Sequence, residues 1–434
     1  MLKKEFNKKL INMINESTSS YMCVEYIKKE LDKKGFTKLE ETYKWKLKPG
    51  KYYVIRNDAS IVAFEIPSND SDIFNIITTH CDTPSLLLKP NGAFIKNNYL
   101  KLNIMPYGGL LNYGWLDHPL SLSGRVIYKD NNKIKKKIID FKETELVIPS
   151  VAIHQNDKAN TNLDLNMQID LIPICGLAKE SKEWIKYISK KCKVENIIDY
   201  DLHAYNNQLP QIFGINKELL FSPRIDNVTS VCASLESFLI SRSNNIKVFC
   251  SFNNEEIGSL TEEGADSNFL IDILKRICAS LNIDISTSLS KSFIISSDNT
   301  HALHPNHSEL SDDTGELYLG KGIAIIKEIT STTNAISSSV LKTICDNNKI
   351  MYQNATAKND LSGGSTLSGI SLRHLSVLSV DIGIPQLAMH SSCEVCALND
   401  VFELYKLMKA FYEVSILVKK DNIFISNKRS KSNA

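Results

Sequence analysis

The sequence predicts an α/β fold in which a mixed, mainly parallel sheet is flanked by helices and interrupted by a β-rich insertion. Strand-like and helix-like segments alternate after residue 220, which is typical of a parallel sheet covered by helices. Short strand-like segments separated by turn residues follow one another from about residue 92 to 215, which indicates a β-rich unit. The 434 residues are also enough for two to three domains of roughly 150 residues each.

The amino-terminal part is expected to contain two helices, a hairpin and a strand. Apolar residues recur at helical spacing over residues 6–14 and 24–31. Residues 52–67 predict a β-hairpin, because two segments rich in β-forming residues flank an Asn-Asp turn. Residues 74–82 predict an apolar strand that ends in polar residues.

Residues 93–214 are predicted to form the inserted domain, and residues 1–92 and 215–434 a discontinuous α/β domain. The alternative is a β excursion of one domain, but the return of the α/β pattern favours an insertion. The expected strands of the insertion are 93–95, 99–104, 120–128, 136–141 and 145–148. After it we expect helices 227–241, 269–281, 335–346 and 400–417, and strands 247–252, 292–296 and 376–382.

The composition argues against several classes of protein. A net charge of +2 gives no reason to expect nucleic acid or an anionic membrane as a partner. No run reaches the ~20 apolar residues of a membrane span, and the amino terminus has no apolar signal core, so we expect a cytoplasmic protein. Among ten cysteines, Cys393 and Cys396 form a lone C-x-x-C pair, for which free cytosolic thiols are a better interpretation than a redox or zinc site.

Five polar clusters each follow an apolar, strand-like run. They are T-T-H-C-D-T-P (78–84), S-P-R-I-D-N (222–227), N-N-E-E-I-G-S (253–259), S-S-D-N-T-H-A-L-H-P-N-H (296–307) and M-H-S-S-C-E (389–394). Functional residues gather beyond the carboxyl ends of strands in open α/β sheets. Taken singly, a strand-end His is more often structural and a Glu-Glu pair more often solvated. Their joint occurrence favours convergence on one crevice.

Imidazoles and carboxylates together suit Zn²⁺, with Mn²⁺ or Co²⁺ also admissible. One bridging carboxylate can hold two cations ~3.5–4 Å apart, and a water between them has its pKa lowered to roughly 7. A further free carboxylate could move the proton from that water to a leaving amine. The clusters therefore predict metal-assisted hydrolysis. Spacing alone leaves open whether Glu255 or Glu256 is that base, because neighbours on an extended segment point opposite ways.

Eight stretches resemble, in order and approximate spacing, the aspartyl aminopeptidase family of dinuclear zinc metallopeptidases, in its bacterial type. They are T-H-C-D-T-P (79–84), Y-G-G-L-L-N-Y-G-W-L-D (107–117), S-L-S-G-R-V (121–126), I-P-S-V-A-I-H (148–154), F-S-P-R-I-D-N (221–227), N-E-E-I-G-S (254–259), S-S-D-N-T-H-A-L-H-P-N (296–306) and Q-L-A-M-H-S (386–391). The resemblance implies a phosphorylase/aminopeptidase-like catalytic domain and an inserted β-rich dimerisation domain.

The resemblance also implies a role for each polar residue. His80 and Asp298 would hold one metal ion, Glu256 and His390 the other, and Asp226 would bridge the two.

Two further carboxylates have implied catalytic roles. Glu255 would be the general base and acid, and Asp82 would orient His80 from behind, where a carboxylate fixes the tautomer of a ligating imidazole.

Members of the family resemble one another in forming dodecamers built from dimers, in which a His of the insertion reaches a neighbour's active site. His154 is the matching position, although a strand-end His with a local partner is the alternative. Lys327 in G-I-A-I-I-K matches a lysine that meets acidic substrate side chains, and His301 and His304 lie in the family's substrate-binding motif. The family's Q-R-Y motif is absent after Lys327, which puts a preference for acidic residues in doubt.

The leading prediction is therefore a cytoplasmic aminopeptidase with two divalent metal ions, which removes an amino-terminal residue, Asp or Glu, from peptides. One alternative is a self-assembling shell or cargo protein with a vestigial site. The other is a related dinuclear amidohydrolase that acts on another amide, because the same metal core serves several chemistries.

Overall fold

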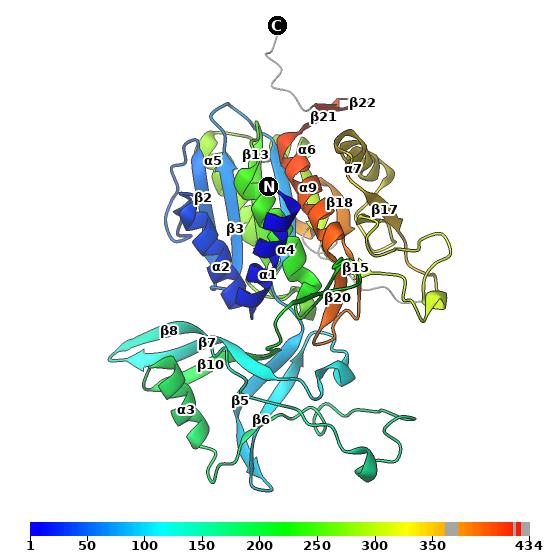
Figure 1. Ribbon diagram of the computed structural model, residues 1–434. Coiled ribbons are helices and arrows are strands. Elements are labelled where there is room, and N and C mark those ends of the chain that lie inside the picture. Colours follow the sequence, from blue (N-terminus) through cyan, green and yellow to red (C-terminus); the bar gives the residue numbers. More distant parts are fainter. Residues whose placement is uncertain (361–371, 420–421, 427–434) are drawn as a thin grey trace.

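The computed structural model describes residues 1–360, 372–419 and 422–426. Figure 1 shows an α/β unit above a smaller unit that is rich in strands. The α/β unit is built on a nine-stranded mixed sheet. In spatial order its strands are β1 (Thr37–Lys38), β2 (Gly50–Arg56), β3 (Ser60–Ile66), β13 (Ile246–Phe252), β4 (Phe74–His80), β14 (Phe293–Ser297), β18 (Leu378–Gly383), β16 (Ile323–Ile326) and β17 (Tyr352–Ala355).

Helices cover both faces of this sheet. One face packs against α1 (Lys3–Glu16), α2 (Ser20–Lys33), α4 (Ile225–Ile240), α7 (Ala335–Asn348) and α9 (Leu398–Glu413). The other face packs against α5 (Phe269–Leu281) and α6 (Ile285–Ser290). On β13, Phe249 enters the first core while Val248 and Cys250 enter the second, as the alternation of a strand requires. Both faces are therefore buried, which explains the continuous apolar runs of the central strands.

The observed elements confirm most of the predicted α/β pattern. Helix α5 has the predicted bounds, and β13, β14, β18 and α7 differ from prediction by one or two residues at an end. The predicted helix 400–417 was too long. Helix α9 ends at Glu413, and β21 (Ser415–Lys419) follows and pairs with β22 (Asn422–Ser426). The run Ser-Ile-Leu-Val favours a strand.

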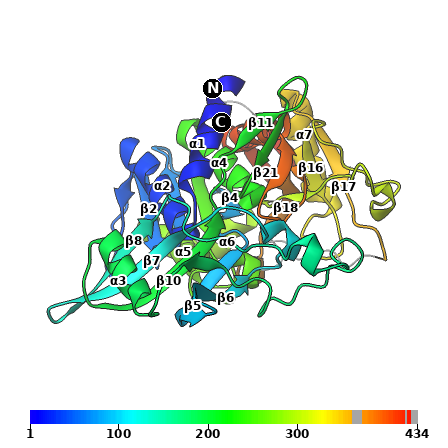
Figure 2. The same cartoon turned by 60° about the horizontal axis from the view of Figure 1, so that its bottom comes forward.

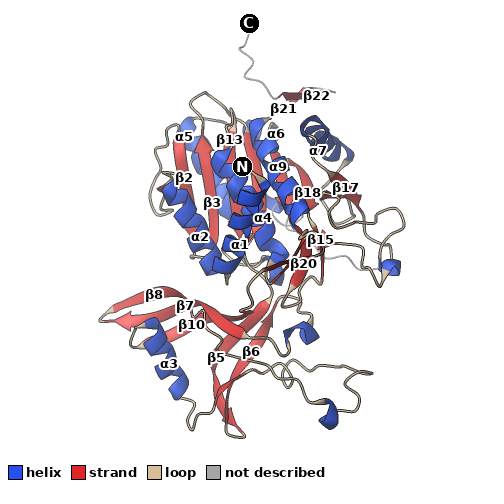
Figure 3. Ribbon diagram, viewed as in Figure 1, coloured by secondary structure: helices blue, strands red, loops and turns tan. Residues whose placement is uncertain are grey.

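The second unit is a six-stranded sheet in the order β8 (Lys133–Asp140), β7 (Leu120–Asp130), β10 (Ile197–Asn206), β5 (Ser85–Lys96), β6 (Tyr99–Tyr107) and β9 (Ile174–Gly176). Figure 3 shows its strands, its long loops and helix α3 (Glu183–Cys192). The sequence reading missed α3, although Trp184, Ile188 and Cys192 recur every four residues and are its buried side chains. Strand β5 begins before the predicted first strand, and the predicted strand 145–148 forms isolated bridges at Leu146 and Val147.

A five-stranded sheet lies where the two units meet. Its order is β11 (Gln211–Phe213), β12 (Leu219–Ser222), β20 (Glu394–Ala397), β19 (Pro385–Leu387) and β15 (Thr300–His301). Because it brings together the segments around residues 220, 300 and 390, it places three of the polar clusters side by side. Across the described ranges, none of the helices combines the length and the apolar character that a membrane crossing requires.

Candidate metal centre

Polar residues at or just after the ends of three neighbouring strands lie at one edge of the large sheet. Strand β4 ends at His80 and runs parallel to β13 on one side and to β14 on the other. Glu255 and Glu256 follow β13 in a 3₁₀ turn (Glu255–Ile257), and Asp298 directly follows β14. Parallel strands end at the same edge, so residues far apart in sequence become neighbours.

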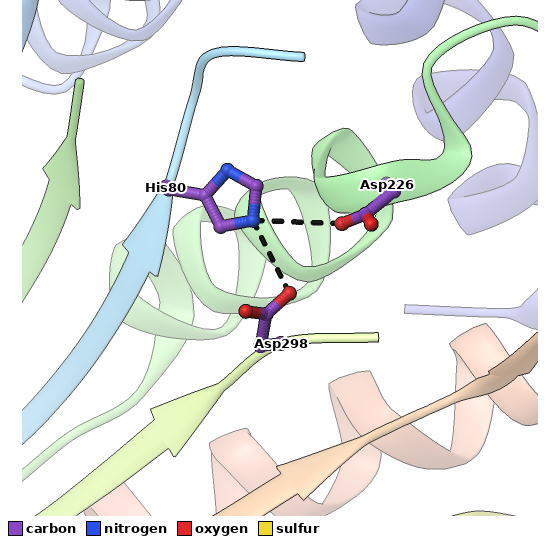
Figure 4. Close-up of side chains that lie close together, drawn as sticks. All are labelled: His80, Asp226 and Asp298. Atoms are coloured by element: carbon purple, nitrogen blue, oxygen red, sulfur yellow. Dashed lines mark hydrogen bonds and ion pairs between the residues drawn. The ribbon is translucent and has the colours of Figure 1, made fainter. Parts of the chain in front are cut away.

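His80 faces two carboxylates, as Figure 4 shows. Its Nε2 atom lies 3.2 Å from Asp298 Oδ1 and 3.5 Å from Asp226 Oδ1. Its other ring nitrogen, Nδ1, lies 3.1 Å from the backbone carbonyl oxygen of Asp82. That carbonyl can only accept, so Nδ1 carries a proton and donates it.

His390 repeats this arrangement on the other side of Asp226. Its Nε2 atom lies 3.6 Å from Asp226 Oδ2 and 3.4 Å from Glu256 Oε2. Its Nδ1 atom donates to the Gly109 carbonyl oxygen at 2.7 Å. The two carboxylate oxygens of Asp226 thus face two different imidazoles, which is the arrangement of a carboxylate between two cation positions.

Asp226 and His390 are held by one buried carboxylate that the sequence reading assigned no role. Glu394 Oε2 accepts from the Asp226 backbone N–H at 3.0 Å, and Glu394 Oε1 accepts from the His390 backbone N–H at 3.1 Å. Gln386 Nε2 also donates to Oε1 at 3.1 Å. The sequence feature that could have identified Glu394 is its position at the end of the M-H-S-S-C-E cluster, which follows a strand-like run.

Asp82 is held by the inserted sheet. Tyr107, the last residue of β6, donates its hydroxyl to Asp82 Oδ2 at 2.8 Å, and Asn254 Nδ2 donates to the Tyr107 oxygen at 2.9 Å. The Glu256 backbone N–H also reaches Asp82 Oδ2 at 3.2 Å. The other oxygen, Asp82 Oδ1, lies 3.4 Å from His80 Nδ1. Tyr107 therefore fixes the carboxylate that lies behind His80.

The two adjacent glutamates do not lie on an extended segment, so the expected opposition of their side chains does not apply. Both belong to the 3₁₀ turn after β13. Glu255 Oε2 lies 4.0 Å from His80 Nε2, and its side chain retains 11% exposure, while that of Glu256 retains 2%. Glu255 is thus the more open of the two.

The charges of the cluster are strongly perturbed. Burial, and next the Asp298 carboxylate, raise the pKa of Glu255 to about 8. Burial acts to raise the pKa of Asp226, but hydrogen bonds to His390 and His80 outweigh it and hold that pKa far below its usual range. Burial acts to lower the pKa of His390, but Asp226 raises it to about 9. The protein alone leaves an excess of carboxylates here.

The donor set fits divalent cations. With Nδ1 donating to a carbonyl on both rings, Nε2 is the nitrogen of His80 and of His390 that faces the carboxylates, and a bound cation would replace its proton. Within the described residues, Asp226 Oδ1, Glu256 Oε1 and Asp82 Oδ1 are buried without a hydrogen-bond partner. Ligand atoms of His80, Asp226 and Asp298 lie within 4.8 Å of one another, and so do those of Asp226, Glu256 and His390. Imidazole and carboxylate in such groups suit Zn²⁺.

The cluster opens into a cavity of about 590 Å³. Asp226, Glu255, Asp298 and His390 belong to its lining, and so does His301.

Three predicted substrate contacts lie elsewhere in the described chain. His304 lies beside His307 with ring centroids 5.2 Å apart, outside the cavity lining. His154 lies exposed in the insertion, in the turn Ile153–Gln155, and does not line this cavity. Lys327 is exposed and is absent from the lining, although both of its neighbours belong to it.

Comparisons with known proteins agree over nearly the whole chain. The family model described as aminopeptidase I zinc metalloprotease (M18) matches residues 13–412. A probable M18 family aminopeptidase 2 of Clostridium novyi is 40% identical over 432 residues, which cover 95% of this chain and 99% of that protein. A protein of the same description from Clostridium acetobutylicum is 38% identical over 430 residues, covering 94% and 99%.

Solved structures share the fold. A chain in the cryo-EM structure of the Ape4 and Nbr1 complex superposes with a TM-score of 0.90 at 30% identity, covering 94% of this chain and 86% of that one. The S. cerevisiae mApe1 dodecamer gives a TM-score of 0.82 at 25% identity, covering 94% and 96%. The predicted fold class and the predicted class of enzyme, a metal-dependent peptide hydrolase, are confirmed at the level of the family. The chain belongs to the M18 family of aminopeptidases, which are zinc metalloproteases.

Proposed function

We propose that this chain removes single amino-terminal residues from peptides with two divalent metal ions, Zn²⁺ in the first place. His80 and Asp298 would hold one ion, Glu256 and His390 would hold the other, and Asp226 would contribute an oxygen to each. The observation that carries this proposal is the pair of Asp226 oxygens, 3.5 Å and 3.6 Å from the Nε2 atoms of two imidazoles whose Nδ1 atoms are already engaged by carbonyls.

Each side chain of the centre has a defined task. Bound ions would polarise the scissile carbonyl and lower the pKa of a water molecule. Glu255 takes the proton of the attacking water and delivers it to the leaving amine, because it lines the cavity and its carboxylate lies 4.0 Å from His80 Nε2, farther than those of Asp226 and Asp298. Its raised pKa, about 8, suits a group that must both accept and return a proton near neutral pH.

The remaining contacts keep the two imidazoles in place. Asp82 and the Gly109 carbonyl hold the Nδ1 protons, which leaves both Nε2 atoms available as ligands. Glu394 accepts hydrogen bonds from the backbones of both Asp226 and His390, which fixes the position of one residue relative to the other.

The proposal extends to the assembly and to the predicted residue His154. The solved mApe1 relative is a dodecamer, and the insertion of this chain exposes apolar side chains at Val151, Ile153 and Ile169. We place residues 93–214 in an assembly domain that joins dimers into a dodecamer, and His154 at the active site of a neighbouring subunit. Its exposure within one subunit supports this role.

A reducing, cytoplasmic location is also proposed. All ten cysteines are free, including Cys393 and Cys396, and free thiols are typical of reducing compartments.

The decisive experiment replaces Glu255 by Gln. The variant should keep both metal ions, measured by metal analysis of the purified protein, and lose about 10²–10⁴-fold in kcat. Glu262→Gln is the matched control, because Glu262 is an exposed carboxylate on the following loop. Near-normal hydrolysis by Glu255→Gln would overturn the role of Glu255. A wild-type protein that binds no metal and hydrolyses no peptide would instead favour the shell or cargo alternative, and hydrolysis of N-acylated amino acids alone would favour the other amidohydrolase.

A further inference from the structure

Part of the lining of the active-site cavity comes from the end of β16 and the segment that follows it. Ile326 and Glu328 both line the cavity, whereas Lys327 between them is exposed and does not. The Lys327 backbone N–H donates to the Ala355 carbonyl at 3.0 Å, so the segment continues the pairing with β17. Successive side chains of an extended segment point to opposite sides, which explains why the glutamate, rather than the lysine, faces the cavity.

The wall beside Glu328 is apolar. Leu317, Ile326 and Ala355 line the cavity and belong to one small buried cluster with Ala324. An apolar wall that ends in a carboxylate suits a long aliphatic side chain with a cationic tip, because such a side chain packs its methylene groups and leaves its charge at the end.

Glu328 has no cationic partner among the described residues. The cavity lining includes one lysine, Lys358, but its ammonium group already donates to the Glu309 carbonyl at 3.0 Å and lies 3.5 Å from Asp360. The residues 361–371, which the structure does not describe, include no Lys, Arg or His in the sequence. Burial, and next the Asp381 carboxylate, raise the pKa of Glu328. A cation arriving with the substrate would relieve both effects.

We propose that Glu328 is a specificity-determining residue that selects amino-terminal Lys or Arg by pairing with the cationic side chain along the Leu317, Ile326 and Ala355 wall. This inference rests on the proposed aminopeptidase function and deepens it. It opposes the acidic preference that the sequence resemblance attached to Lys327.

The test compares two substrates that differ mainly by one ammonium group. The kcat/KM values of lysyl and norleucyl amides are measured for wild type, Glu328→Gln and Glu328→Lys, with Leu, Asp and Glu amides in the same panel. Wild type should prefer the lysyl amide by about tenfold or more, the scale of a hydrogen bond between charged groups. Glu328→Gln should abolish that ratio while norleucine hydrolysis changes by less than about threefold, and Glu328→Lys should reverse it. Asp313→Asn is the matched control, because Asp313 is an exposed carboxylate outside the cavity lining.

The outcomes separate this inference from the function on which it rests. A wild type that cleaves norleucyl and lysyl amides equally, or a ratio that Glu328→Gln leaves unchanged, overturns the role of Glu328 while aminopeptidase activity stands. A preference for Asp and Glu amides overturns it in favour of Lys327. If wild type hydrolyses none of the amides with Zn²⁺, Mn²⁺ or Co²⁺, both proposals fail together. A melting temperature for Glu328→Gln equal to that of wild type confirms that the comparison is made on folded protein.

Discussion

The large sheet and the inserted sheet are both continuous, but they bury their residues in different ways. Every residue of β4 and β13 is buried, because helices pack on both faces. Strand β8 of the insertion has no buried residue, and β6 alternates buried and less buried positions. Figure 2 brings the insertion to the front, with α3 beside β7, β8 and β10. Its core, around Trp115, Leu122 and Leu202, forms a separate cluster.

The two regions therefore position the candidate metal centre in different ways. A strand buried on both faces holds its end rigidly, and the proposed metal ligands follow such ends or the loops beside them. The insertion contacts the centre through the Tyr107 hydroxyl on Asp82 and through two backbone groups on His390, the Gly109 carbonyl and the Leu111 N–H. The α/β unit therefore supplies the proposed metal ligands, and the insertion helps to orient two of their neighbourhoods, at His80 and at His390.

The sharpest test of this contrast compares a histidine from each region. His80→Ala removes a proposed ligand and should lower kcat/KM by more than about 10³-fold, because a bound ion contributes several kcal/mol to the transition state. It should also lower the zinc content, and the same loss should follow from chelation of wild type and be reversed by added Zn²⁺. His118→Gln in the insertion is the control, because His118 is half-buried and does not line the cavity, and this variant should retain both ions. An equal loss of kcat/KM and of zinc in the two variants would contradict the assignment of the metal ligands to the α/β unit.

A matched pair of core truncations tests whether the two cores act separately. Ile77 in β4 and Leu202 in β10 are both fully buried, so replacing either by Ala should cost about 2–5 kcal/mol of unfolding free energy. Only Ile77→Ala, three residues before His80, should also weaken zinc binding. Urea unfolding and zinc titration measure the two effects. Weakened zinc binding in Leu202→Ala would show that the insertion's core supports the site directly.

Tyr107→Phe tests the insertion's reach into the centre. Loss of the hydroxyl leaves Asp82 Oδ2 with only the Glu256 N–H and should reduce metal affinity or activity by about 10–100-fold, the usual effect of removing a partner behind a ligand. Tyr200→Phe is the control, because that hydroxyl bonds the Lys89 carbonyl at 3.1 Å within the inserted sheet. If both variants retain full activity and metal affinity, the Tyr107 contact has no orienting role.

The smallest expected effect concerns acid stability of the insertion. Burial lowers the pKa of His203 to about 4 from a usual 6.5. The unfolded chain therefore binds more protons between those values, so this group's contribution to stability is present above about pH 6.5 and is lost as pH falls towards 4. In the metal-free protein, melting temperatures of wild type and His203→Gln should approach each other over that range as pH falls. If the two melting temperatures stay the same distance apart over this pH range, the lowered pKa of His203 is contradicted.

Much of the architecture could be predicted from local patterns. The α/β alternation, helix α5 and the hairpin of β2 and β3 follow from periodicity and turn residues, which act over a few neighbours. Helix α3 and the change from α9 to β21 were missed, because short amphipathic segments look alike in a strand-rich context and tertiary packing decides between helix and strand.

The sequence determined the residue types that a metal hydrolase needs and the order in which they occur, because each cluster follows an apolar, strand-like run. The resemblance of eight motifs then named the family, which the comparisons confirm. Tertiary structure alone decided which atoms face one another. The two oxygens of Asp226 face two imidazoles, and Glu394 hydrogen-bonds the backbones of Asp226 and His390, because strand register brings together residues far apart in the chain. Strand alternation decides that Glu328, and not Lys327, lines the cavity.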